Sequence, residues 1–232
     1  MNKKLRLSMV VRNEEHRYLR QVLESAKKYI TDAVILDDNS TDNTVSICRD
    51  ILKDIPHKII QNKESKFHNE WELRYQQWEE TIKDEPDWII FLDADEIFED
   101  SFIEGVEELL NNDNCYLYSF RLYDFWDLEH YRDDEIWCAH NTYRPFLIRY
   151  KKEFTYEFKQ SSQHCGRMPY NVYSLNNELS SYRVKHYGWA KKEDRELKYK
   201  RYLELDPNGV NGSILQYMSI IDEHPKLTKW EE

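Results

Sequence analysis

Glycine is scarce in this sequence, and its scarcity excludes two common ways of holding a nucleotide. The 232 residues include only five glycines, at positions 105, 166, 188, 209 and 212. The chain contains neither G-x-x-x-x-G-K-[ST] nor G-x-G-x-x-G, the patterns that cradle phosphates with backbone N–H groups. If the protein binds a nucleotide, we therefore expect a metal ion and basic side chains to hold its phosphates.

Long apolar runs are absent as well. No stretch approaches the ~18 apolar residues of a transmembrane helix, and the first residues, MNKKLRLSMVVRNEE, lack the apolar core of a signal peptide. We therefore expect a cytoplasmic protein with no transmembrane segment.

The four cysteines are far apart and form no C-x-x-C pair, so we expect free, buried thiols in a reducing compartment.

Basic side chains are fewer than acidic ones. The 33 Lys and Arg residues against 44 Asp and Glu residues give a formal net charge of -11. Such a surface repels phosphate backbones, which excludes general nucleic-acid binding.

Aromatic residues, by contrast, are abundant, with 17 Tyr, 9 Phe and 7 Trp. An aromatic face can cover the apolar C–H face of a sugar while its polar edge stays in water, so the composition suits saccharide binding.

Strand-like and helical segments alternate through the first 110 residues. Apolar runs predict strands over 5–11, 33–36, 58–61 and 88–92, and helical spacing of apolar residues predicts helices over 16–29, 45–55 and 71–82. This alternation indicates an α/β fold with a mainly parallel central sheet flanked by helices. The second half is less regular, with strands predicted over 116–123 and 144–150 and helices over 191–203 and 213–223. Because no linker or repeat interrupts the chain, we expect one domain over residues 1–232.

Polar clusters follow three of the predicted strands, at residues 12–15, 37–42 and 93–96. In parallel sheets, ligands bind beyond the carboxyl ends of the strands. We therefore expect the three clusters to converge on one crevice.

Asp93 and Asp95 come directly after the most apolar strand candidate. Alternate residues of an extended segment share a face, so both carboxylates can point the same way. Two such carboxylates repel each other unless a cation lies beside them, and oxygen ligands favour Mg²⁺ or Mn²⁺. The pattern predicts a divalent metal site that also holds phosphates. The alternative is a solvated acidic turn before the next helix.

The second cluster is Asp37-Asp38-Asn39-Ser40-Thr41-Asp42. A carboxylate held at a strand end, such as that of Asp38, can accept the N3–H of uracil or thymine, or the N1–H and amino group of guanine. Residues of these types also cap helices, so Ser40 or Thr41 is an expected cap for the next helix. Both roles can coexist in one segment.

Three motifs occur in order along the chain: SMVVRNEE, LDDNSTDNT, and a strand that runs into DADE. Over about the first 110 residues they resemble family 2 glycosyltransferases, and the later HYGW with its Tyr- and Lys-rich helix is similar to a bacterial subgroup. The resemblance implies a GT-A fold with a nucleotide- and metal-binding half (1–110) and an acceptor-binding half (111–232). It also implies metal-dependent, inverting transfer of a sugar from a nucleotide diphosphate donor, UDP or dTDP, to a saccharide-like acceptor in surface polysaccharide synthesis.

The resemblance assigns roles to individual residues. In the family, the aspartate at the position of Asp38 contacts the base. The aspartate at Asp95 binds the metal, Mn²⁺ or Mg²⁺, and the one at Asp93 supports the ribose or the metal. Arg12 and Glu14 match the segment that lines the nucleotide pocket.

Three further assignments complete the predicted site. Arg74 resembles a position that faces the nucleotide, with a surface salt bridge as the alternative. His186 lies where several GT-A enzymes place a histidine that completes the metal site, with a structural core histidine as the alternative. The chain shows no clear Glu-Asp pair for the catalytic base, and the nearest carboxylates are Asp133, Asp134 and Glu135. We assign Asp133 as the base that removes the acceptor proton.

Two other interpretations compete with this one. Haloacid-dehalogenase-like phosphohydrolases also place Asp-x-Asp after an apolar strand, but near the N-terminus and with Thr or Val two residues after the second Asp. Here the motif lies at 93–95 and continues as Glu96-Ile97, and the 37–42 cluster would be unexplained. The third interpretation is a catalytically inactive module that binds carbohydrate or a nucleotide.

Overall fold

The computed structural model describes residues 3–161, 165–210 and 212–232. The strands are β1 (Leu5–Val11), β2 (Asp32–Asp37), β3 (His57–Gln61), β4 (Trp88–Phe91), β5 (Glu96–Phe98), β6 (Leu117–Asp124), β7 (His130–Arg132), β8 (Tyr143–Arg149), β9 (Asn177–His186) and β10 (Leu227–Lys229). The α-helices are α1 (Leu19–Ala26), α2 (Thr44–Leu52), α3 (Glu70–Thr81), α4 (Asp100–Asn111), α5 (Lys192–Leu205) and α6 (Ile214–Ser219), and the 3-10 turns are η1 (Ala139–Asn141), η2 (Tyr170–Ser174) and η3 (Tyr187–Trp189).

The described residues form an eight-stranded sheet in the order β3-β2-β1-β4-β8-β6-β9-β5. Strands β1 to β4 are parallel to one another, and β6 is parallel to β9. Strand β8 runs antiparallel to both β4 and β6, and β5 runs antiparallel to β9. The predicted α/β fold with a mainly parallel sheet is therefore confirmed. Strands from both halves of the chain share the sheet.

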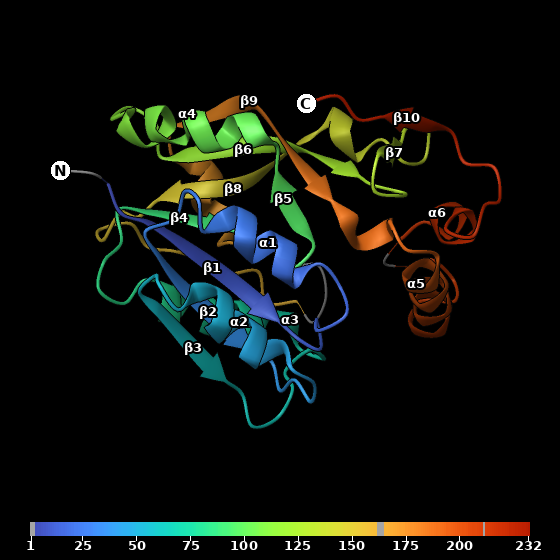
Figure 1. Ribbon diagram of the computed structural model, residues 1–232, viewed down its shortest axis with the longest axis horizontal. Coiled ribbons are helices and arrows are strands. Elements are labelled where there is room, and N and C mark those ends of the chain that lie inside the picture. Colours follow the sequence, from blue (N-terminus) through green and yellow to red (C-terminus); the bar gives the residue numbers. More distant parts are fainter. Residues whose placement is uncertain (1–2, 162–164, 211) are drawn as a thin grey trace.

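Helices cover both faces of this sheet, and Figure 1 shows α1, α2 and α4 on one side. The apolar core on that side joins alternate residues of β1, such as Leu7 and Met9, to α1, α2 and α4. On the other face, Trp78 of α3 packs with Phe91 of β4 in a second core. Helices α5 and α6 lie apart from these layers, beside the carboxyl ends of the parallel strands (Figure 1).

The polar clusters at 12–15 and 37–42 meet as predicted, because β1 and β2 are parallel neighbours. Asn13 adopts a left-handed conformation with φ 54°, and its side-chain oxygen accepts a hydrogen bond from Thr41 N at 2.8 Å. Its backbone N–H donates to Ser40 Oγ at 2.9 Å. The prediction that Ser40 or Thr41 caps α2 is wrong: the helix begins at Thr44, and Asp42 accepts from its N–H at 3.0 Å. Ser40 and Thr41 instead form hydrogen bonds with Asn13, in the turn after β1.

Several element bounds differ from the predictions. Helix α1 begins at residue 19 rather than 16 because the preceding residues form the turn over the site. Helix α6 ends at Ser219 rather than 223. Strand β5, over 96–98, was not predicted, whereas α4, over 100–111, is the helix expected after the acidic turn. Within the ranges described above, no helix has the length and apolar character needed to span a bilayer.

Candidate functional site

Glu96 stabilises the turn that follows β4. Its buried carboxylate accepts a hydrogen bond from the backbone N–H of Asp93 at 2.8 Å. Arg167 donates to both oxygens of Glu96, at 2.6 and 2.7 Å, and its guanidinium also lies 4.2 Å from the centroid of the Phe146 ring. This bidentate pair ties a segment of the second half to the metal-binding turn predicted from the sequence. The turn is therefore more than a solvated acidic loop.

Asp93 is flanked by two arginines. Arg74 contacts its Oδ1 at 3.1 Å, and Arg167 approaches its Oδ2 to 3.6 Å. Burial alone would raise the pKa of Asp93, but the two guanidinium groups hold it below its usual range. The side chain of Arg74 is only 14% exposed, and its contact with a nucleotide stays a prediction. In this arrangement Asp93 faces the arginines.

Asp95 is paired with a histidine from the end of β9. His186 Nε2 lies 3.7 Å from Asp95 Oδ2, and Nδ1 lies 2.7 Å from Oδ1 of the buried Asp124. Burial alone would lower the pKa of His186, but the two carboxylates raise it to about 10. Likewise, burial would raise the pKa of Asp95, but His186 holds it well below its usual range. The fold therefore places His186 next to Asp95, and their binding of a metal ion stays a prediction.

Gly188 lies directly against this pair. A Cβ atom at this position would lie 2.6 Å from both Asp95 Oδ2 and His186 Nε2, and 2.7 Å from Lys198 Nζ. The three polar atoms therefore crowd the position that a Cβ atom would take, so a glycine is needed at residue 188. Lys198 comes from α5, and burial lowers the pKa of its ammonium group.

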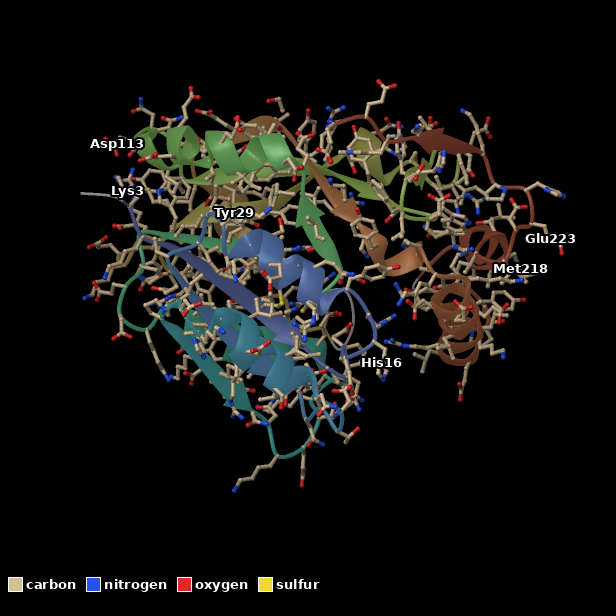
Figure 2. The ribbon with its side chains drawn as sticks, in the orientation of Figure 1. Lys3, His16, Tyr29, Asp113, Met218 and Glu223 are labelled. Carbon is tan, nitrogen blue, oxygen red and sulfur yellow. The ribbon has the colours of Figure 1, made fainter. Side chains whose placement is uncertain are left out.

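Glu14 lies on the turn after β1, close to Asp95. Burial raises the pKa of its carboxyl to about 7, against the opposing effect of Arg17, and the nearby charge of Asp95 raises it further. Arg17 lies 3.5 Å from Glu14 Oε1 and 3.2 Å from Oδ1 of Asp194 at the start of α5. Lys191 Nζ also donates to the carbonyl of His16 at 2.8 Å. His16 is labelled in Figure 2, where it faces α5. The first strand-end cluster thus lies between the turn at 93–96 and α5.

Asp38 is fully buried, whereas a carboxylate that contacts a base was expected to be accessible. Its carboxylate accepts hydrogen bonds from Ser65 Oγ at 2.7 Å, Lys66 N at 2.8 Å and Asn62 Nδ2 at 3.0 Å. Burial would raise its pKa, but these donors hold it below the usual range. Asp38 therefore organises the segment after β3. Its contact with a base stays a prediction.

Arg12 reaches the segment that Asp38 organises. Its guanidinium lies 5.6 Å from the centroid of the Phe67 ring, and Arg201 of α5 lies 5.0 Å from the same ring. Phe67 is 46% exposed. Two cations and an exposed aromatic face therefore border the region where a nucleotide is expected to bind.

Asp133 lies elsewhere, beside the two-stranded sheet of β7 and β10. Its Oδ2 accepts from Thr228 Oγ1 at 3.3 Å, and its Oδ1 lies 3.3 Å from His140 Nε2. In the described parts of the chain, its ion pairs and hydrogen bonds do not connect it to Asp95 or His186. Its side chain is 34% exposed and so remains accessible to a ligand.

A divalent ion fits the pair formed by Asp95 and His186. Two ligand atoms 3.7 Å apart can each lie about 2.1 Å from a single ion. The hydrogen bond to Asp124 fixes the imidazole and leaves Nε2 for the ion, which is the usual support of a metal-binding histidine. Over the described ranges, however, no three His, Cys, Asp or Glu side chains are gathered as a preformed metal site. Asp93 would have to turn away from its arginines to join.

The sequence reasoning missed four residues of this site. Glu96 lies within the DADE motif, so its position was visible although its role was not. Asp124 directly follows the strand predicted over 116–123, which was a usable signal. Arg167 and Lys198 lie in segments whose spacing to the motifs carries no information, and only the fold brings them here.

Comparisons with known proteins agree with this geometry. Residues 7–177 match the family described as Glycosyl transferase family 2, whereas no curated protein matches the sequence. Among solved structures, S. aureus TarS 1–349 is similar with a TM-score of 0.56 and 14% identity, over 94% of this chain and 69% of that one. The same fragment in complex with UDP-GlcNAc has a TM-score of 0.57 and 14% identity, over 95% and 71% of the two chains.

A further similar structure is GalNAc-T7 with UDP, GalNAc and Mn²⁺. It has a TM-score of 0.55 and 14% identity, over 95% of this chain and 56% of that one. At such identities the structural likeness shows the GT-A fold, and the match over residues 7–177 shows the family. The chain therefore belongs to glycosyltransferase family 2 and is a glycosyltransferase of the GT-A fold.

Proposed function

We propose that this protein is a metal-dependent, inverting glycosyltransferase that transfers a sugar from a UDP or dTDP donor to a saccharide or related acceptor. The observation that carries the proposal is the pairing of Asp95 with His186, backed by Asp124, beside Gly188. UDP-GlcNAc complexes of TarS and the Mn²⁺ in GalNAc-T7 support this choice of donor and cofactor. The pathway, surface polysaccharide synthesis, follows from the family resemblance.

Each part of the chain has its own task in this reaction. The segment that Asp38 organises holds the base, with Arg12 beside it, and Arg74 and Glu14 line the nucleotide pocket. Asp95, His186 and Asp93 would hold a Mn²⁺ or Mg²⁺ ion, which supplies Lewis-acid stabilisation of the diphosphate leaving group when bound. We assign Asp133 as the base that accepts the proton of the attacking acceptor hydroxyl, because its carboxylate is accessible.

The decisive experiment is a thermal-shift panel of UDP, dTDP, GDP and CDP, each with and without Mn²⁺, followed by an assay for hydrolysis of the matching nucleotide sugar. A nucleotide at 100 times its dissociation constant stabilises the fold by about 2.7 kcal/mol. We expect stabilisation by UDP or dTDP that requires Mn²⁺, together with Mn²⁺-dependent release of the sugar. Binding without any turnover would indicate an inactive module, and the absence of binding by all four nucleotides would refute the proposal.

A further inference from the structure

Lys198 brings a positive charge from α5 to the border of the predicted metal site. Its Nζ donates a hydrogen bond to the Gly188 carbonyl at 2.7 Å and lies 4.2 Å from the centroid of the Trp189 ring. A Cβ on Gly188 would touch this Nζ together with Asp95 Oδ2 and His186 Nε2. The ammonium group, the carboxylate and the imidazole therefore border one small volume.

The ammonium group of Lys198 has more N–H donors than the hydrogen bonds it forms with described residues. It carries three N–H donors, and in the described ranges one hydrogen bond, to the Gly188 carbonyl, is formed. No described carboxylate lies within ion-pair distance of it. A partly buried cation without a direct counter-charge is costly, and its open donors point to an anionic ligand with several oxygens.

Helix α5 is docked by apolar and by polar contacts. Its Tyr199 and Tyr202 pack against the cluster of Trp126, Trp137, Trp189 and Ile220. None of its residues, 192–205, is fully buried. It is joined to the turn after β1 by the Arg17–Asp194 ion pair and to the second half by Arg195, which donates to the Trp126 carbonyl at 2.8 Å. Partly exposed ion pairs contribute little to stability. A ligand that binds both the strand-end cluster and Lys198 would therefore strengthen the docking of α5.

We propose that Lys198 binds the diphosphate of the sugar-nucleotide donor and so couples donor binding to the docking of α5. This inference rests on the proposed function, because it takes the donor to be a nucleoside diphosphate sugar. The diphosphate would lie beside Lys198 and the Asp95–His186 pair, where it can also contact an ion held by that pair. Lys198 stabilises the negative charge that grows on the leaving group as the sugar departs.

The test compares Lys198→Met with Lys200→Met, an exposed lysine on the same helix. The quantities measured are the dissociation constants, in Mn²⁺, of the preferred nucleoside diphosphate and of the nucleoside without phosphates. We expect Lys198→Met to weaken the diphosphate about 10- to 100-fold, the range for a lost charge-assisted hydrogen bond. Binding of the nucleoside should change less than about twofold, and Lys200→Met should change neither.

Lys198→Gln is the second variant, because its amide can still donate to the Gly188 carbonyl while the charge is lost. It should show the same selective loss, and Lys198→Arg should retain most of the affinity. Equal losses for nucleoside and diphosphate, or a diphosphate affinity within about twofold of the wild type in both uncharged variants, would overturn the assignment of Lys198 alone. If the wild-type protein binds none of the nucleoside diphosphates, the proposed function fails and this inference with it.

Discussion

His186 Nδ1 lies 2.7 Å from Oδ1 of Asp124, the last residue of β6. The two residues lie opposite each other in the parallel β6–β9 ladder, so the sheet itself sets their distance. This hydrogen bond orients the imidazole and leaves Nε2 to face Asp95. Asp124 is therefore a positioning residue for the proposed metal site.

Asp124→Asn is expected to raise the Mn²⁺ concentration needed for nucleotide binding about 10- to 100-fold, the usual effect of losing such a support. His186→Ala should raise it further. The control is Asp127→Asn, which alters another Asp–His pair, with His130 at 3.1 Å. Mn²⁺ titrations followed by thermal shift measure the effect. If Asp124→Asn and His186→Ala both need the same Mn²⁺ concentration as the wild type, His186 has only a structural role.

Asp95→Ala should abolish metal-dependent nucleotide binding, whereas Asp93→Ala should weaken it less. The reason is that Asp95 faces His186, while Asp93 is held by Arg74 and Arg167. The measurement is the stabilisation by UDP with and without Mn²⁺. Full stabilisation of the Asp95 variant by UDP and Mn²⁺ would show that the metal assignment is wrong.

Asp38→Asn should weaken binding of the base by roughly 1.5–3 kcal/mol, because a charged acceptor is lost. Since Asp38 also holds the segment at 62–66, some loss of stability is expected as well. The control is Asn62→Ala, which removes one of the donors and keeps the carboxylate. Titrations with the nucleoside and with ribose 5-phosphate separate base from ribose contacts. Normal nucleoside binding, or a variant that does not fold, would argue against a base-binding role.

Asp133→Asn should lower the rate of transfer about 100-fold or more while donor binding is kept, because a positioned general base contributes at least that much. Glu135→Gln, an exposed neighbour in the same loop, is the matched control. Asp134 is a poor candidate because Arg132 binds it at 2.6 Å and it accepts from the Trp137 N–H. Steady-state assays with a saccharide acceptor measure the rates. If the Asp133 variant transfers sugar at the wild-type rate, the base lies elsewhere.

Glu14 should make the apo protein less stable as the pH rises from about 4.5 to 7. Its folded-state pKa is raised from 4.5 to about 7 by burial and by nearby Asp95 and Asp194, which outweigh Arg17 and Lys198. The folded state then binds the proton more tightly than the unfolded state, and this advantage is lost through that window. Between these pH values, the free energy of unfolding of Glu14→Gln should rise relative to that of the wild type by at most about 3 kcal/mol.

Denaturant unfolding at several pH values checks the Glu14 prediction. Glu15→Gln is a control on the same turn, where the pKa shift is in the opposite direction because Asn43 donates to the carboxylate. A constant stability difference between Glu14→Gln and the wild type from pH 4.5 to 8 would contradict a raised pKa.

The sequence by itself determined the elements with a local signal. The apolar run over 5–11 coincides with β1, and the spacing of Trp71, Trp78 and Ile82 predicted α3 within one residue at each end. The convergence of the clusters at 12–15, 37–42 and 93–96 was also predictable. It follows from the parallel order of β1, β2 and β4, which any alternation of strands and helices favours.

Only the tertiary structure decided which side chains meet across the site. The contacts of Arg167 with Glu96 and of Lys198 with Gly188 join segments whose separation in the chain carries no periodic signal. The burial of Asp38 depended on the path of the segment after β3, which the strand pattern does not specify. The place of Asp133 beside β10, and not beside Asp95, likewise follows from the pairing of β7 with β10. Local periodicity determines strands and helices, whereas contacts between distant segments depend on register and loop paths, which arise only when the whole chain packs.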